Sequence, residues 1–176
     1  MNWILHAPDG YGIEVLPESH MRAFGPATLH MAWRRAENGT VEANFRFECD
    51  RLKWTPAEVD QARAALKAFG EEPSPVIVFQ NLGEAHLEAG RLKEAMAEFR
   101  GLSQRHPTAP GPLVRLAQAE QTAGLAEASR KTLGRAISLD PSAEQPHRQL
   151  GWSLQHDAMG RRFHPGWDRA GAAAEL

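Results

Sequence analysis

The chain contains few residues whose type and spacing could support catalysis. Cys49 is its single cysteine and therefore its one candidate thiol nucleophile. It alternates in phase with Phe45 and Phe47 along an apolar stretch, so we expect a buried and unreactive thiol. The sequence has no G-x-S-x-G motif and no glycine-rich phosphate loop after a predicted strand. We therefore predict a non-enzyme with no catalytic residue and no cofactor.

A second group of polar and aromatic residues lies near the C-terminus. Its members are His156, Asp157, Arg161, Arg162, His164, Trp167 and Asp168. A zinc-binding helix usually presents two histidines one turn apart, whereas His156 and His164 are eight residues apart, with glycine and proline around them. We therefore expect a structural insertion and no metal site. Trp152, Phe163 and Trp167 would anchor it, and its arginines would pair with its two aspartates.

The charge of the chain is nearly balanced, with a formal net charge of −2 over 176 residues and both signs interspersed. Such a pattern favours neither a nucleic-acid partner nor an anionic membrane surface. No apolar run is long enough to span a membrane, and the first residues lack the segments of a signal peptide. We predict no membrane insertion and a cytoplasmic location as written, or a bacterial cell envelope if the chain is part of a longer protein.

Positions of the second half recur in register at one fixed offset. The matched pairs are Gly83 with Ala117, Gly90 with Gly124, Ala95 with Ser129, Phe99 with Leu133, and Pro107 with Pro141. Small residues suit points where two helices touch, glycine suits a helix end with positive φ, and proline ends the next helix. The pattern and its period resemble the tetratricopeptide repeat (TPR), a unit of two antiparallel helices. The resemblance implies an all-α array of helical hairpins, a right-handed solenoid.

We place the repeats at 76–109, 110–143 and 144–176, the last one irregular and truncated. Ser142 followed by Gln145 predicts a capping box at the start of the third unit. An insertion of nine residues then displaces the expected small position from 163 to Ala172. No polar capping helix follows. We expect either a piece of a longer protein or a last helix that docks on a partner or mediates self-association.

The region 1–72 has a different period. Apolar residues alternate with polar ones over 29–33 and 41–49, which indicates two half-buried strands joined by a turn at Asn38-Gly39. We predict further strands at 13–16 and 3–5, and a helix near 56–69 with a Thr55–Glu58 capping box. The predicted class is α+β: a small antiparallel β-rich domain (1–72) with one helix, a short link, and the helical repeats (76–176).

This first region also resembles the β-rich domain that follows the core of certain bacterial transglutaminase-like proteins. The residues that carry the resemblance are Phe24-Gly25-Pro26-Ala27, the hairpin, and Trp54-Thr55-Pro56-Ala57-Glu58 before a helix. The tail from Gly151 to Ala172 is similar to a repeat found there. The Cys, His and Asp motifs of the enzyme core have no counterpart in this chain. The resemblance implies the non-catalytic C-terminal part of such an enzyme, which would position or dock its substrate.

The TPR resemblance implies a concave groove formed by the first helix of each repeat. The side chains expected to face this groove are Gln80, Asn81, Glu84, Glu88, Arg115, Gln118, Arg148, Gln149 and Trp152. Arginine can bind a carboxylate and tryptophan offers a large rigid anchor, so a protein or extended peptide segment is the expected partner. The groove lacks the lysine and asparagine pattern with which some TPR proteins bind a C-terminal carboxylate. The leading hypothesis is a non-catalytic protein-interaction module; the transglutaminase appendage and a plain spacer are the alternatives.

Overall fold

The structure is a computed structural model that describes residues 1–36, 39–157 and 161–175. The chain forms two compact units, Met1–Gln80 and Asn81–Leu176. The sequence predicts domains at 1–72 and 76–176 with a short link between them, whereas the first unit extends through that link to Gln80. The α+β class is confirmed: an antiparallel sheet comes first and a series of helices follows.

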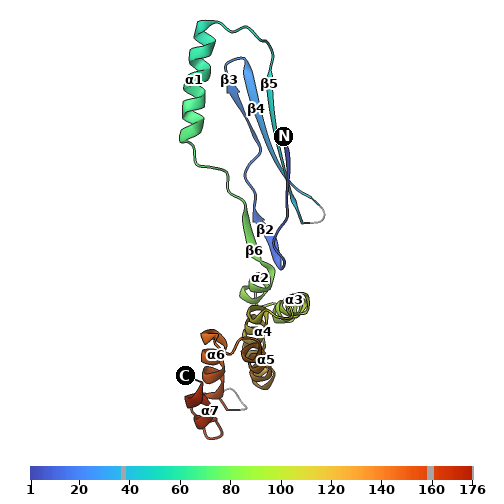
Figure 1. Ribbon diagram of the computed structural model, residues 1–176, viewed down its shortest axis with the longest axis vertical. Helices are drawn as coiled ribbons and strands as arrows, with labels where there is room; N and C mark the ends of the chain where they lie inside the picture. Colours follow the sequence, from blue (N-terminus) through green and yellow to red (C-terminus); the bar gives the residue numbers. More distant parts are fainter. Residues whose placement is uncertain (37–38, 158–160, 176) are drawn as a thin grey trace. The chain divides into compact units, whose positions relative to one another are not determined.

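The first unit is built on a four-stranded antiparallel sheet with the strand order β1-β5-β4-β3 (Figure 1). The strands are β1 (Asn2–Leu5), β3 (His20–Phe24), β4 (Ala27–Arg35) and β5 (Val41–Cys49). In the central pair, Ala27 lies opposite Cys49 and Arg35 lies opposite Val41. The predicted hairpin of β4 and β5 is therefore confirmed. Gly39 has φ +75°, as the turn requires, and Asn38 lies outside the described residues.

One helix covers part of the apolar side of this sheet. Helix α1 (Pro56–Glu71) packs along β3, where the Phe69 ring meets the Phe24 ring edge-on at 5.9 Å between centroids. Its predicted capping box is present: the Thr55 hydroxyl accepts from the Glu58 N–H, and the Glu58 carboxylate accepts from the Thr55 N–H at 2.8 Å. Gly25 lies close to this helix, since an added Cβ would be 2.9 Å from the Glu58 carbonyl oxygen.

A short two-stranded sheet pairs β2 (Tyr11–Val15) with β6 (Val78–Asn81). The repeat pattern had predicted a helix beginning near Val76, and this prediction is wrong for residues 78–81. The run Val76-Ile77-Val78-Phe79 is rich in β-branched and aromatic residues, which favour a strand when another strand is available for pairing. The helix begins only at Leu82. Asn81 is its N-cap, and the Asn81 side-chain oxygen accepts a hydrogen bond from the Glu84 N–H at 3.0 Å.

The second unit is a series of helices in which each packs on the next, and α4 also packs on α6 (Figure 1). They are α2 (Leu82–Glu88), α3 (Leu92–Arg105), α4 (Pro110–Thr122), α5 (Ala126–Leu139), α6 (Glu144–Leu154) and α7 (Arg169–Ala174). The start of α3 is related to that of α5, and the start of α4 to that of α6, by the same offset as the sequence repeat. Gly90 and Gly124 follow α2 and α4 with φ of +71° and +77°, as predicted.

The core of this unit forms where α2, α3 and α4 meet. Phe99 is 1% exposed and packs with Ala95, Leu102 and Leu116. Gly83 faces the same ring so closely that an added Cβ would lie 2.5 Å from a Phe99 carbon atom. The prediction that Gly83 is small because helices touch there is confirmed.

The start of α6 differs from its prediction. Helix α6 follows Ala143, which provides no side-chain cap. Ser142 instead donates from its hydroxyl and its N–H to the Asp140 carboxylate, at 2.7 and 3.0 Å. These two hydrogen bonds lower the pKa of Asp140. Asp140 and Ser142 thus form an Asx-type turn, in which both Ser142 donors bind the Asp140 carboxylate. The predicted capping box does not form.

Candidate functional site

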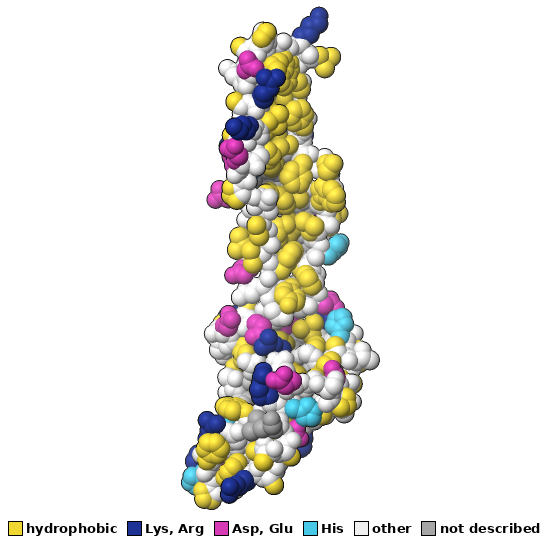
Figure 2. All heavy atoms as spheres, turned by 60° about the vertical axis from the view of Figure 1, so that its left-hand side comes forward, with side chains coloured by type: hydrophobic (Ala, Val, Ile, Leu, Met, Phe, Trp, Pro, Cys, Tyr) yellow, Lys and Arg dark blue, Asp and Glu magenta, His cyan; other side chains and the backbone are white. Residues whose placement is uncertain are grey.

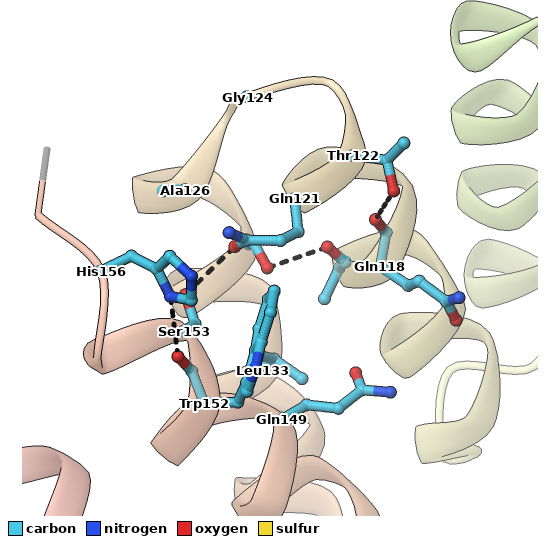
Figure 3. A pocket seen from close by; sticks show the side chains of 12 residues that line it. Gln118, Gln121, Thr122, Gly124, Ala126, Leu133, Gln149, Trp152, Ser153 and His156 are labelled. Atoms are coloured by element: carbon cyan, nitrogen blue, oxygen red, sulfur yellow. Dashed lines mark hydrogen bonds between the residues drawn. The ribbon is translucent and has the colours of Figure 1, made fainter. Parts of the chain in front are cut away.

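The helical unit contains a cavity of about 710 Å³ between α4, α5 and α6 (Figure 3). Its lining residues are Ala117, Gln118, Gln121, Thr122, Gly124, Ala126, Ser129, Leu133, Gln149, Trp152, Ser153 and His156. The volume falls within the roughly 300–1,000 Å³ typical of ligand pockets. Apolar and polar groups share the lining, and no Asp, Glu, Lys or Arg is among the described residues that form it.

Helical spacing explains how these residues come together. Gln118 and Gln121 are three residues apart on α4, and Gln149 and Trp152 are three residues apart on α6, so each pair lies on one helix face. Leu133 of α5 is buried beneath them. The tight turn between α4 and α5, which depends on the positive φ at Gly124, brings these two helices together beside the cavity.

Internal hydrogen bonds fix part of the lining. The Ser153 hydroxyl donates to the Gln121 side-chain oxygen at 3.1 Å, and this bond joins α6 to α4 (Figure 3). The Ser129 hydroxyl donates to the Ala117 carbonyl at 2.8 Å and so joins α5 to α4. Both are uncharged hydrogen bonds within the walls, and they hold three helices in register around the cavity.

Donor groups remain free within the cavity. The side-chain oxygen of Gln118 accepts from Arg115 at 3.2 Å, and that of Gln121 accepts from Ser153. Their NH₂ groups, and the whole amide of Gln149, make no hydrogen bond to another described residue. Three side-chain amides therefore offer N–H donors to whatever occupies the cavity.

His156 and Trp152 form one wall. Their rings lie 4.4 Å apart between centroids, and the His156 Nδ1 is 3.0 Å from the Trp152 carbonyl oxygen (Figure 3). With a proton on Nδ1, this nitrogen donates to the carbonyl, and Nε2 of the neutral ring is left as an acceptor. His156 is 8% exposed, whereas Trp152 is 46% exposed. The wall thus combines a buried polar ring with an accessible apolar one.

Arg130 of α5 supports this wall from behind. Its guanidinium donates to the Ser153 carbonyl at 2.9 Å and to the His156 carbonyl at 2.8 Å. The Ser153 carbonyl belongs to the last turn of α6, and the His156 carbonyl lies just beyond the end of that helix. A cation at a helix C-terminus is also favoured by the helix dipole. Arg130 therefore fixes the end of α6, and its guanidinium donors are engaged within the protein.

The structure brings three of the nine predicted groove residues together in this cavity: Gln118, Gln149 and Trp152. The two predicted arginines pair with carboxylates of the chain. Arg115 Nε lies 2.9 Å from a Glu84 oxygen, and Arg148 lies 3.1 Å from Glu144.

The other predicted groove residues lie elsewhere. Gln80 belongs to β6 of the first unit, Asn81 caps α2, and Glu88 is the last residue of α2.

Sequence reasoning missed Gln121, Ser153 and His156. Gln121 follows Gln118 by one helical turn, a signal that could have identified it. Ser153 adjoins Trp152 in the sequence, but nothing in the repeat pattern predicts its bond to Gln121. His156 had been placed in a structural insertion, because the repeat pattern ends before it.

The insertion itself is held mainly by polar contacts. Arg161 donates from Nε and from its backbone N–H to the buried Asp157 carboxylate, both at 2.9 Å, and this predicted pairing is confirmed. The predicted pairing of Arg162 is wrong, since its guanidinium binds the Gln155 side-chain oxygen at 2.8 Å. Asp168 instead caps α7 by accepting from the Gly171 N–H. Residues 158–160 of the insertion lie outside the described residues.

The three predicted aromatic anchors lie in two different places. The rings of Phe163 and Trp167 meet edge-on at 5.2 Å, within the insertion. Trp152 contacts His156 and lines the cavity. Trp152 is therefore the one predicted anchor that also belongs to the candidate site.

The candidate nucleophile Cys49 lies in the other unit, and the prediction of its burial is wrong. Its side chain is exposed, and its Sγ is 3.0 Å from the Arg51 carbonyl oxygen. The side chain is exposed because no described residue covers this part of the apolar side of β5, where Phe47 is also 63% exposed. Within the described residues, no group of three or more His, Cys, Asp or Glu side chains is arranged to hold a metal ion.

Over the same part of the chain, none of the helices has the length and apolar character needed to cross a membrane. No protein family matches the chain, and no curated protein matches it either.

Proposed function

We propose that the chain is a non-catalytic protein-interaction module. In this proposal, the helical unit is a TPR-like array that binds an extended segment of another protein. The regular offset of its helices and the glycine turns after α2 and α4 support the array. The first unit then acts as a neighbouring β-rich domain without a catalytic role.

The cavity between α4, α5 and α6 is the observation that carries the proposal. It combines an accessible tryptophan with side-chain amides that have free donors. Tryptophan is the residue type most often found at the energetic centre of protein interfaces, and amides bind peptide groups by matched hydrogen bonds. A surface that offers both is suited to a polypeptide ligand.

The polar groups of the cavity are not arranged as a catalytic pair. The Ser153 hydroxyl donates to the Gln121 amide and makes no hydrogen bond to a described base. Nδ1 of His156 is engaged by a backbone carbonyl, in a site without a carboxylate. Nucleophilic catalysis needs a nucleophile within hydrogen-bond reach of a base, and the described lining lacks this arrangement. This supports binding over chemistry.

The proposal is tested by selecting phage-displayed random peptides on the immobilised chain. We expect clones that bind the wild-type protein and lose binding to Trp152→Ala. The matched control is Trp3→Ala, which removes an exposed tryptophan from β1 of the first unit and leaves the cavity intact. Failure to enrich any clone, or clones that bind Trp152→Ala as well as wild type, would contradict the proposal.

A further inference from the structure

We propose that the cavity binds an uncharged segment of an extended polypeptide, with one aromatic or large aliphatic side chain as its anchor. The amides of Gln118, Gln121 and Gln149 would donate to the carbonyl groups on either side of the anchor. This inference rests on the proposed function and specifies the class of partner. Figure 3 shows the residues that carry it.

The charge of the surroundings selects an uncharged anchor. The described lining has no Asp, Glu, Lys or Arg, and the guanidinium groups nearby already have ion-pair or hydrogen-bond partners. Arg115 contacts Glu84, Arg148 contacts Glu144, and Arg130 donates to two backbone carbonyls. A carboxylate or ammonium group entering the cavity would lose water without gaining a partner of opposite charge, which is costly.

The shape and surface of the cavity select a large apolar group. Ala117, Ala126 and Leu133 provide aliphatic surface, and the Trp152 ring stands beside them. Burial of an aromatic or leucine side chain against such surface is favourable in proportion to the apolar area removed from water. Edge-to-face contact with the indole would add to this for an aromatic anchor.

The free hydrogen-bonding groups match a peptide backbone. The cavity offers three amide NH₂ groups as donors, and Nε2 of His156 would accept in the tautomer that carries its proton on Nδ1. An extended chain presents carbonyl acceptors and N–H donors at regular intervals on both sides of any side chain. A cavity of about 710 Å³ has more room than one side chain fills, so flanking peptide groups can also enter.

The site is also held in place before any ligand arrives. Arg130 fixes the end of α6, and the bond from Ser153 to Gln121 joins α6 to α4. A binding surface that is already ordered loses less conformational entropy on association. We therefore expect binding without a large rearrangement of α4 or α6.

The test is a titration of the full ¹⁵N-labelled chain with short peptides that are acetylated and amidated at their ends. The peptides are identical except for their central residue: Trp, Leu, Glu or Lys. The Trp and Leu peptides should saturably shift the Trp152 indole and the Gln118 and Gln149 side-chain amide signals. The Glu and Lys peptides should bind at least about tenfold more weakly, which corresponds to about 1.4 kcal/mol.

Two substitutions examine the contacts one at a time. Trp152→Ala should abolish saturable binding of the Trp peptide, whereas Trp3→Ala should leave it unchanged. Gln118→Leu should weaken binding by about three- to tenfold, the loss expected for one or two hydrogen bonds. Gln104→Leu is its matched control, because Gln104 is an exposed glutamine of α3 outside the cavity. Preserved dispersion of the remaining signals shows that each variant is folded.

The outcomes separate this inference from the proposed function. Tighter binding of the Glu or Lys peptide, with dependence on Trp152, would overturn the uncharged anchor and leave the interaction module standing. Absence of binding by all four peptides would also overturn this inference, and the phage selection would then decide the proposed function. An unchanged affinity in Gln118→Leu would refute the assigned role of that amide.

Discussion

The two units differ in how they bury apolar side chains. In the helical unit, neighbouring helices enclose Phe99, which is 1% exposed. In the first unit, Phe47 lies on the apolar side of β5 and is 63% exposed. Other well-exposed apolar side chains of this unit are Trp3, Ile4, Met21, Leu52 and Leu66. Figure 2 shows hydrophobic side chains gathered over the first unit, in the upper part of the view.

The difference follows from the number of layers. An apolar sheet face is buried only where a second layer packs on it, and α1 packs along β3. In the second unit, each of the helices from α3 to α6 packs on the preceding helix and on the next. Alternation along a strand therefore indicates which residues share a face, whereas a helical repeat also supplies the layer that covers it.

The largest expected effect is the difference in unfolding free energy lost when Phe99 and Phe47 are each replaced by alanine. Phe99→Ala should lower the free energy of unfolding of the helical unit by about 3–5 kcal/mol, because it leaves a cavity in a closed core. Phe47→Ala should change the stability of the first unit by no more than about 0.5 kcal/mol, since its ring is mostly in water. Urea unfolding followed by hydrogen exchange in each unit measures both. Equal losses of unfolding free energy in the two units would contradict the proposed difference in burial.

The next largest effect is the difference in stability change between alanine substitutions at two helical glycines of the second unit. Gly83→Ala should destabilise it by about 1–3 kcal/mol, because the new methyl group would overlap the Phe99 ring. Gly134→Ala on α5 is the control, since an added Cβ there meets no atom within 4 Å. It should stabilise α5 by about 0.5–1 kcal/mol through helix propensity. Stabilisation by both substitutions in thermal unfolding would show that α2 can move away from α3.

Helix caps provide a smaller contrast between the units. Thr55→Ala removes the capping box of α1 and should cost about 0.5–2 kcal/mol. Ala143→Ser adds a hydroxyl at the N-cap of α6, which has no side-chain cap, and should gain up to about 1 kcal/mol. Hydrogen exchange of the first turn of each helix reports these changes. No change in α1 would mean that its docking on β3, and not its cap, fixes where it begins.

The smallest expected effect is a pH dependence at the end of the helical unit. The hydrogen bond from His147 Nδ1 to Glu175, at 2.6 Å, raises the pKa of His147, and the Pro141 carbonyl at Nε2 adds to this. A raised folded-state pKa stabilises the unit below the unfolded value of about 6.5, and this stabilisation is lost as pH rises through the folded pKa.

Thermal unfolding of wild type and His147→Gln measures this contribution. The difference in Tm should be larger near about pH 5.5 than near about pH 8.5, because the imidazole loses its charge as pH rises through its folded-state pKa. Glu175→Gln should remove most of the pH dependence and so serves as the control. A difference that grows towards high pH would refute the assigned pairing.

Much of the fold could be predicted from local patterns. The β4–β5 hairpin, the capping box of α1 and the glycine turns after α2 and α4 each depend on residues close together in the sequence. The strand at 78–81 was missed because a helical repeat register and a run of β-branched residues gave opposite indications. Pairing with β2, which lies far earlier in the chain, decided between them.

The candidate site could be predicted only in part. The repeat phase identified Gln118, Gln149 and Trp152, because residues one turn apart share a helix face. The repeat phase also predicted that Arg115 would face the ligand, whereas its guanidinium pairs with Glu84 of another helix. It also missed His156, which lines the cavity from an irregular segment just after the end of α6.

Local patterns in the sequence specify the β4–β5 hairpin, the capping box of α1 and the glycines at which α2 and α4 end. These depend on interactions within a few residues. Tertiary packing leaves Phe47 and Cys49 exposed, encloses Phe99, and determines which polar groups remain free in the cavity. Burial and pairing depend on partners brought from distant parts of the chain, and no local pattern specifies those partners.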